Sequence, residues 1–218
     1  MGYNLCRLAY IEPMGETVVY DGHHSQEVEG IVAGKVRDQM IDGAIRLLAR
    51  QGLQATSFSE VLALTGAPRG SVYHHFPGGK DQLVGAAVDR AGARALHALD
   101  GKEGASAEEL TSVFLALWRA LLVRSDCGAG CAVLAVTVAT DSQELLQHAG
   151  AVFRSWRGEL AELFEHAGLS AKEAAQFAAT LVAASEGAVV LARAEQSLEP
   201  FELVADHLLE QVRKLSMG

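Results

Sequence analysis

Residues 65–83 read TGAPRGSVYHHFPGGKDQL, and this stretch decides how the rest of the chain is interpreted. It sets an Arg, a Ser, a Tyr and two His within one short segment and follows them with glycines and a Lys. Pro68 suits the first turn of a helix, where its missing N–H is not needed. Val72 and Phe76 are four residues apart, which predicts an inward-facing row. The polar side chains then have outward-pointing positions.

Two interpretations of that polar face remain open at this point. One is an amphipathic surface helix whose polar side is only solvated. It leaves Gly70 unexplained, because a Gly inside a helix costs roughly 0.5–1 kcal/mol relative to Ala. The other is a recognition helix in the major groove of DNA, where another backbone approaches closely. Arg69 and Ser71 would then donate to base edges or phosphates, and Tyr73 and the two His would reach the backbone.

The segments before this stretch predict two further helices. Apolar residues at four-residue spacing from Val36 to Leu48 predict a helix that starts at Lys35 and ends at Gly52. Ser57 and Glu60 have the spacing of a capping box, which opens a short second helix. The third is RGSVYHHF, and a tight Gly-containing turn joins it to the second. Three helices so joined form a helix-turn-helix arrangement.

The rest of the chain also shows helical periodicity, with no alternating strand pattern and no internal repeat, so the predicted fold class is all-α. Helices are expected from Lys80 past Ala91, from Ser106 to about Leu121, from about Ala132, from Asp141 or Ser142 to His166, from Ser170 to about Gln196, and from Glu199 onward.

Composition and charge indicate the setting. The chain has 218 residues and 50% hydrophobic residues, it has only four prolines, and its net charge is −9. Residues 35–97 hold eight Lys or Arg against five Asp or Glu, a local +3 that fits a local anionic partner such as DNA. Three cysteines make no disulfide framework, and we find neither an export signal nor an apolar run of about 20 residues. We therefore expect a cytoplasmic protein without a membrane partner.

Catalytic and metal sites are not expected. The PGGK at residues 77–80 resembles part of a phosphate loop, but the leading glycine is missing and Asp81 stands in place of Ser or Thr. Neither His74-His75 nor His23-His24 has further ligands or a nucleophile nearby. Cys127 and Cys131 are favoured as buried or loop thiols over a redox or metal role. The sequence predicts no enzyme, no cofactor and no metal.

The combined pattern of residues 35 to about 90 resembles the DNA-binding domain of the tetracycline-repressor (TetR) family of bacterial transcription regulators. The matching features are the helix ending before Gly52, Thr56-Ser57, Val61-Leu62, Thr65-Gly66-Ala67, Gly70-Ser71-Val72-Tyr73, His75-Phe76, and Lys80 with Leu83. The extra glycine in PGGK departs from many members and is similar to the LmrA/YxaF subgroup. The resulting set of expected DNA contacts is Thr56, Ser57, Pro68, Arg69, Gly70, Ser71, Tyr73, His74, His75 and Lys80.

The C-terminal half is also similar to that subgroup, whose members release DNA when a drug-like or phenolic molecule binds. The resemblance implies a homodimer formed by the last two helices, and the nearly all-apolar segment at 174–194 suits a buried helix that approaches a neighbour closely. A simple core helix is the alternative. The candidate effector contacts are Phe114, Trp118, Phe153, Trp156 and Glu186. Ordinary core packing is the alternative for each aromatic residue, and a paired structural carboxylate is the alternative for Glu186.

The prediction from sequence is therefore a ligand-responsive regulator, most simply a homodimeric repressor released from a palindromic DNA operator by a small aromatic or hydrophobic effector. Its expected parts are a flexible N-terminal arm (residues 1–34), a helix-turn-helix DNA-binding domain (35–83) and a helical effector-binding and dimerisation domain (84–218). One rival is a DNA-binding dimer without a small-molecule effector. The other is a helical enzyme or carrier that has lost DNA binding.

Overall fold

The computed structural model describes the backbone of residues 22–217 and the side chains of residues 34–217. The described residues divide into two units, 22–36 and 37–217, and the fold below is that of the second unit. The expected flexible arm lies outside the described residues up to position 21, and the side chains of His23 and His24 also lie outside them. The expected helix start at Lys35 is wrong, because the backbone is already helical from Gly22. Gln and Glu at 26–29 are good helix formers without an apolar period to reveal them.

Within the described residues the secondary structure consists of helices joined by turns and loops and has no strand, which confirms the all-α prediction. The elements are α1 (Gly22–Ala55), α2 (Phe58–Thr65), α3 (Ser71–His75), α4 (Lys80–His97), α5 (Ala107–Ser125), α6 (Ala132–Thr137), α7 (Gln143–His166), α8 (Ala171–Glu195) and α9 (Glu199–Leu215).

Local sequence signals fix most helix ends. The Ser57, Ser106, Ser142 and Ser170 hydroxyls each accept a hydrogen bond from a backbone N–H in the first turn of the helix that follows. Only Ser170 forms the full reciprocal capping box, because its partner Glu173 also bonds back to the cap. These hydrogen bonds satisfy amides that the helix itself leaves unpaired.

The DNA-binding part packs α2 and α3 against the C-terminal half of α1. Met40 and Leu48 of α1, Val61 of α2, and Val72 and Phe76 around α3 are nearly or fully buried. The predicted inward row of Val72 and Phe76 is thus confirmed. Two bends hold this arrangement: Gly52, with φ 80°, interrupts α1, and Gly66, with φ 69°, ends α2. Both φ values lie in the left-handed region that glycine adopts most easily.

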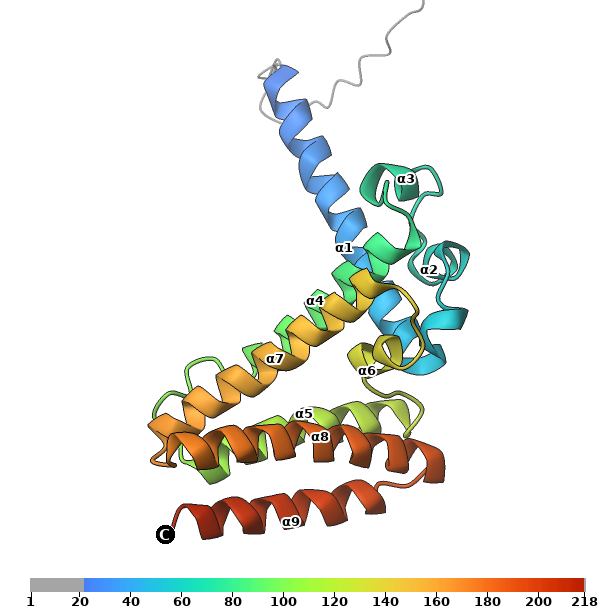
Figure 1. Ribbon diagram of the computed structural model, residues 1–218. Helices are drawn as coiled ribbons and strands as arrows, with labels where there is room; N and C mark the ends of the chain where they lie inside the picture. The colour runs from blue at the N-terminus through green and yellow to red at the C-terminus, as the bar shows by residue number, and fades with distance from the viewer. Residues whose placement is uncertain (1–21, 218) are drawn as a thin grey trace, which may run out of the picture. The chain divides into compact units, whose positions relative to one another are not determined.

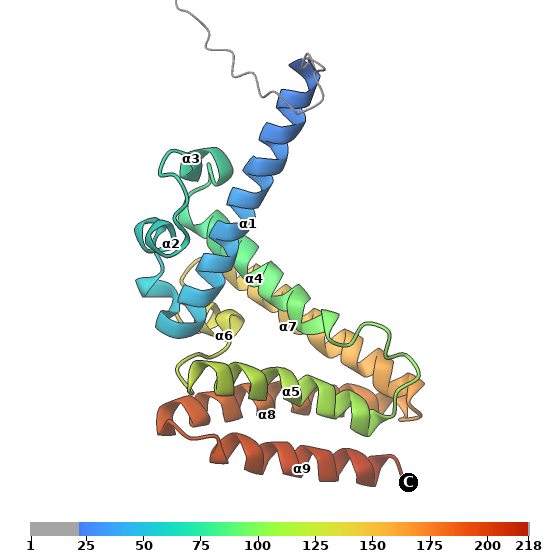
Figure 2. The same ribbon diagram turned by 180° about the vertical axis from the view of Figure 1, so that it is seen from behind.

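The C-terminal part is built from two layers of long helices. In both ribbon views α4 runs beside α7, while α5, α8 and α9 lie together on the other side (Figures 1 and 2). The buried aromatic residues Phe114, Trp156 and Phe164 fill the space between them. By length and composition α8 could cross a membrane, but half of its most apolar window is buried inside the fold. This burial is typical of a core helix.

The C-terminal end of α1 is tied to the C-terminal part through its backbone carbonyls. The Gly130 N–H, just before α6, donates to the Ala49 carbonyl at 2.8 Å. The Arg193 guanidinium, on α8, donates to the Arg50 carbonyl. We call these two hydrogen bonds the α1 joint. Carbonyls at a helix end have no partner within the helix, so the α1 joint satisfies groups that would otherwise need water.

Candidate nucleic-acid interface and apolar cavity

The segment between α2 and α3 forms a tight turn that places a short polar helix at the surface. The third helix begins at Ser71 and not at Arg69 as expected, because Pro68 to Gly70 form the turn that precedes it. The Ser71 hydroxyl donates to the Pro68 carbonyl at 2.6 Å and thereby closes this turn. At the far end, the Phe76 N–H bonds to the Val72 carbonyl at 2.8 Å.

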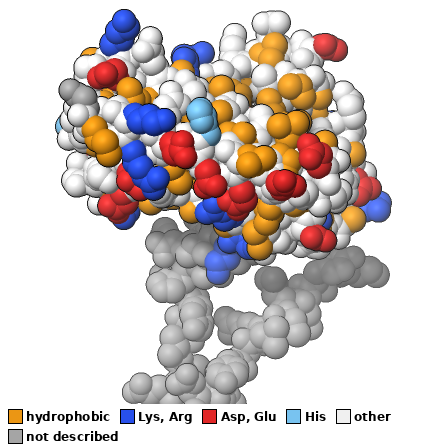
Figure 3. All heavy atoms as spheres, turned by 90° about the horizontal axis from the view of Figure 1, so that it is seen from below, with side chains coloured by type: hydrophobic (Ala, Val, Ile, Leu, Met, Phe, Trp, Pro, Cys, Tyr) orange, Lys and Arg blue, Asp and Glu red, His pale blue; other side chains and the backbone are white. Residues whose placement is uncertain are grey.

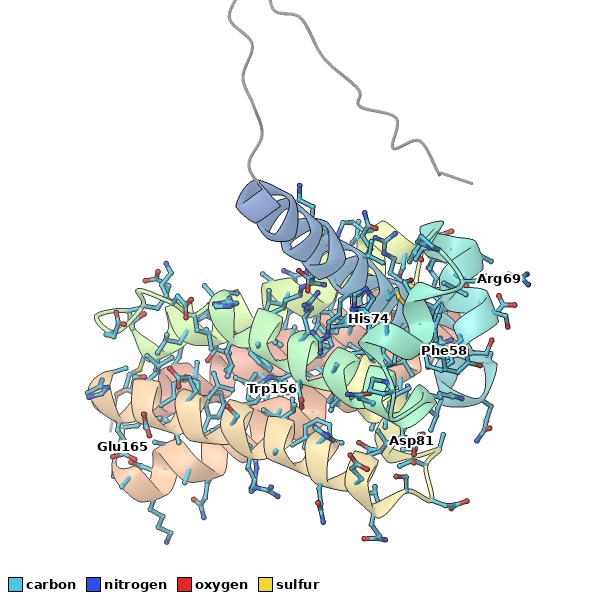
Figure 4. The ribbon with its side chains drawn as sticks, turned by 90° about the horizontal axis from the view of Figure 1, so that it is seen from above. Phe58, Arg69, His74, Asp81, Trp156 and Glu165 are labelled. Atoms are coloured by element: carbon cyan, nitrogen blue, oxygen red, sulfur yellow. The ribbon has the colours of Figure 1, made fainter. Side chains whose placement is uncertain are left out.

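Polar side chains on this turn and helix face solvent together. Tyr73 is 79% exposed, Arg69 and His74 are exposed, and Ser71 and His75 are half-buried. Figure 4 shows Arg69 projecting from the outer edge of the α2–α3 segment, whereas Trp156 lies among the long helices. A large exposed aromatic phenol beside a guanidinium is well suited to contacting a phosphate backbone.

Gly70 has a different structural setting from the one its position in the sequence suggested. It precedes α3 instead of lying in the helix interior, and its φ of −66° needs no glycine. A Cβ added there would meet no atom within 4 Å among the described residues. Gly70 therefore does not carry the free-energy cost of a glycine inside a helix, and that cost no longer supports a DNA contact. The open space around Gly70 is compatible with the close approach of a DNA backbone.

His75 is held in its uncharged form more firmly than an exposed histidine. Burial is the largest cause that lowers the pKa of His75, and the neighbouring His74 and Arg37 lower it further. The His74 and His75 rings meet edge to face at 5.0 Å, and the Arg37 guanidinium stacks on Phe76. At neutral pH His75 can therefore offer a hydrogen bond to DNA but no positive charge.

Three of the predicted contacts lie outside both α3 and the turn that precedes it. Thr56 is only 1% exposed, and its hydroxyl donates to the Gly52 carbonyl at 2.9 Å. The side chain therefore holds the bend that follows α1, and a contact of Thr56 with DNA stays a prediction. Ser57 caps α2, as described above. The Lys80 ammonium donates to the Leu53 carbonyl at 2.8 Å, which leaves two of its three protons for another partner.

An aromatic cluster occupies the centre of the C-terminal part. Trp156 meets Trp118, Phe114 and Phe153 edge to face, with ring centroids 5.9, 6.4 and 5.5 Å away. The Trp156 indole N–H donates to the Gly92 carbonyl at 2.9 Å, so α7 is fixed against α4. Edge-to-face packing of this kind stabilises a core, which supports the packing alternative for Phe114 in particular.

A cavity of about 340 Å³ opens beside this cluster. Trp118 and Trp156 line it, whereas Phe114, Phe153 and Glu186 do not. Its wall also includes Ile45 and Ala49 of α1, Cys131 at the start of α6, and the side chains of Arg94 and Arg124. No motif or spacing in the sequence indicated that these residues line a site. These residues are up to about ninety positions apart in the chain, so no local sequence pattern connects them.

Glu186 is a buried acid with no strong partner. It is 6% exposed, and among the described residues neither carboxyl oxygen has a hydrogen-bond partner. Burial raises its pKa to about 7, and the adjacent Cys131 thiol opposes this only in part. Because no cation pairs with it there, the alternative of a paired structural carboxylate is not supported. Burial and Glu186 in turn hold the pKa of Cys131 well above its usual range.

Cys127 and Cys131 are both buried free thiols, as predicted. Cys131 caps α6 by accepting a hydrogen bond from the Leu134 N–H. Residues 34–217 contain no group of three or more side chains able to hold a metal ion.

A helix-turn-helix motif with an exposed polar second helix, joined to a larger helical domain, defines a class of DNA-binding transcriptional regulators. Comparisons with known proteins agree. Residues 40–87 match the family described as "Bacterial regulatory proteins, tetR family", and residues 107–207 match "Transcriptional regulator LmrA/YxaF-like, C-terminal domain". The chain belongs to the TetR family of transcriptional regulators.

Individual relatives support this assignment. An HTH-type transcriptional regulator of Mycobacterium tuberculosis is 37% identical over 175 residues, which cover 77% of this chain and 89% of the relative. YxaF of Bacillus subtilis is 28% identical over 83% of this chain and 97% of its own length. The regulatory protein TetR from Rhodobacter sphaeroides has the same fold, with a TM-score of 0.71 at 21% identity over 80% of this chain and 97% of that one. These families and relatives are regulators and not enzymes.

Proposed function

We propose that this DNA-binding regulator is a cytoplasmic homodimeric repressor whose hold on a palindromic operator is released by a small apolar effector. The observation that carries the proposal is the exposed polar row at α3, held in place by the buried side chains of Val72 and Phe76. One such row reads only one half-site. A twofold dimer supplies two reading helices about one duplex turn apart, as a palindrome requires.

Exposed apolar side chains on the last two helices support the dimer. Leu203 of α9 is 66% exposed, and Val190 and Leu191 of α8 are each 49% exposed. Figure 3 looks onto the α9 side, where hydrophobic side chains lie between charged ones. In the ribbon views α9 lies on the opposite side of residues 37–217 from α2 and α3 (Figures 1 and 2). A second copy that packed on α8 and α9 would therefore leave both reading helices free.

The cavity beside Trp118 and Trp156 supports the effector response. Its volume is that of a site for a small molecule, and most of its wall is apolar. An effector in this cavity shifts the protein between two geometries only by as much as its affinity for the two differs. The geometry that it favours would separate or rotate the reading helices so that they no longer match both half-sites.

DNA binding and dimerisation can be tested on the same samples. DNA from upstream of the protein's own gene would be titrated in a fluorescence-anisotropy assay, and the molar mass would be measured by light scattering after gel filtration. Leu203→Asp should give a monomer with weakened operator binding. Val123→Asp is the matched control, since Val123 is also an exposed apolar residue (58%) but belongs to α5 and not to the last two helices. A wild-type monomer with no preference for any genomic fragment would overturn the proposal.

The repressor role and the effector response need a different measurement. A reporter placed behind the operator should be silent when the protein is present and active when the effector is added. A thermal-shift screen with aromatic compounds identifies candidates, because a ligand that binds the folded state stabilises it by mass action. Operator binding with no stabilising compound would instead favour the DNA-binding dimer without an effector.

A further inference from the structure

The cavity lies where the DNA-binding part meets the C-terminal part. Ile45 and Ala49 of α1 form one wall, and Trp118 and Trp156 of α5 and α7 form another. The residue before α6, Gly130, both lines the cavity and donates its N–H to the Ala49 carbonyl at 2.8 Å in the α1 joint. A molecule that fills this space therefore touches both parts of the protein at once.

The charged groups in the cavity wall are all positive. Arg94 and Arg124 line it, and no Asp or Glu does so. The Arg94 guanidinium is bonded to the Asp42 carboxylate at 2.6 Å. Arg124 is exposed, and the ion pairs found within residues 34–217 do not include it. The charge of Arg94 is thus balanced by Asp42, whereas the charge of Arg124 is available to pair with a ligand.

The positive charge continues outside the cavity. A neighbouring hollow shares Arg124 with it and adds Arg46 and Arg50 of α1. Three guanidinium groups therefore surround this hollow, in a chain whose net charge is −9. Such a cluster raises the local concentration of anions and speeds their arrival.

We propose that this cavity binds an aromatic organic anion, with its ring system against Trp118 and Trp156 and its acidic group beside Arg124. The ring system gains from leaving water for the apolar wall. The acidic group stays near the opening, where it remains partly hydrated and pairs with a guanidinium without a large desolvation cost. The regulatory meaning of this site depends on the proposed effector response, whereas its ligand chemistry does not.

The position of the site gives a direct route to the DNA-binding helices. Because Ile45 and Ala49 belong to α1, a ligand that requires more room moves α1 against α5 and strains the Gly130–Ala49 hydrogen bond. Operator binding and ligand binding then favour different positions of α1, and the Gly130–Ala49 hydrogen bond couples them. Linkage requires the operator to weaken ligand binding by the same factor that the ligand weakens operator binding.

Two fluorescent probes that differ in one acidic group test the ligand chemistry. The probes are 8-anilinonaphthalene-1-sulfonate and its uncharged counterpart N-phenyl-1-naphthylamine. The chain has two tryptophans, Trp118 and Trp156, and both line the cavity. Quenching of tryptophan emission therefore reports binding near these two rings, and Trp118→Phe and Trp156→Phe show which ring is quenched more.

We expect saturable binding of one sulfonate probe per chain. Arg124→Ala should weaken it about fivefold, as for an exposed ion pair worth about 1 kcal/mol, and leave the uncharged probe unaffected. Arg119→Ala is the matched control, because Arg119 is also on α5 but pairs with Glu202 and does not line the cavity. Ala95→Phe, which fills the cavity, should remove the binding of both probes.

Equal weakening of both probes by Arg124→Ala, or equal effects of Arg124→Ala and Arg119→Ala, would overturn the ligand class. Binding that survives Ala95→Phe would overturn the location. Circular dichroism and thermal unfolding of each variant show that it is folded. Operator binding in the absence of probe is measured separately, so the loss of this inference and the loss of the proposed repressor function give different results.

Discussion

The buried Glu186 carboxyl makes the stability of this protein depend on pH in a way that one substitution should remove. In the folded protein its pKa is raised from 4.5 to about 7. The folded state therefore binds more protons than the unfolded state between these values, and stability falls as pH rises through this window. A change of this size corresponds to about 3 kcal/mol once the group is fully ionised.

Glu186→Gln should abolish that loss. A neutral amide of similar shape resembles the protonated acid, so wild type and variant should have similar stability near pH 5. Near pH 8.5 the variant should be more stable by as much as about 3 kcal/mol, because it has no buried charge. The measurement is urea unfolding followed by circular dichroism at several pH values, at one fixed protein concentration since a dimer would make stability concentration-dependent.

Glu165→Gln is the control for this experiment, because Glu165 is exposed on α7 (Figure 4). It should leave the pH profile unchanged. A stability difference between wild type and Glu186→Gln that is the same at pH 5 and pH 8.5 would refute the reasoning. The acid would then be ionised, or neutral, throughout the range.

Three further changes test other parts of the structure. Tyr73→Ala should weaken binding to all DNA sequences by a similar factor without loss of stability, since Tyr73 is 79% exposed; a loss confined to particular operator bases would contradict phosphate contact. Arg69→Ala should relax sequence choice at one operator position, as competition with single-base operator variants would show, and a uniform loss across sequences would argue against base readout. Gly92→Ala should lower the free energy of unfolding in urea by about 1–3 kcal/mol, because the Cβ of the new alanine would lie 2.6 Å from a Val152 methyl. An unchanged free energy of unfolding would mean that α7 can move away from α4.

Features set by local chemistry could be predicted from the sequence. The helices that follow Ser57, Ser106 and Ser170 begin where the spacing of Ser and Glu indicated, since a hydroxyl and the amides it accepts from lie within one turn. For the helix that follows Ser142 the sequence left Asp141 and Ser142 open as starts, and the structure has Ser142 as the cap. The final helix begins at Glu199, as expected. The burial of Val72 and Phe76 likewise followed from spacing alone.

Features set by packing between distant segments could not be predicted. Nothing near Thr56 in the sequence shows that its hydroxyl turns inward to the Gly52 carbonyl. Pro68 is compatible both with a helix and with the turn that it forms. The sequence left Glu186 with two alternatives, and only the packing around α8 showed that neither of its carboxyl oxygens has a partner within residues 34–217. The α1 wall of the cavity had no sequence signal, because it depends on how α1 meets α5.

The α1 joint has a consequence for protein engineering. Gly130 and Arg193 supply the donors that hold the end of α1, and neither belongs to residues 35–83. A chimera that transplants residues 35–83 onto another regulator therefore carries two acceptor carbonyls to a host that lacks their donors. Exchanging DNA-binding domains between relatives should succeed most often when Gly130 and Arg193, the donors of the α1 joint, are transferred as well.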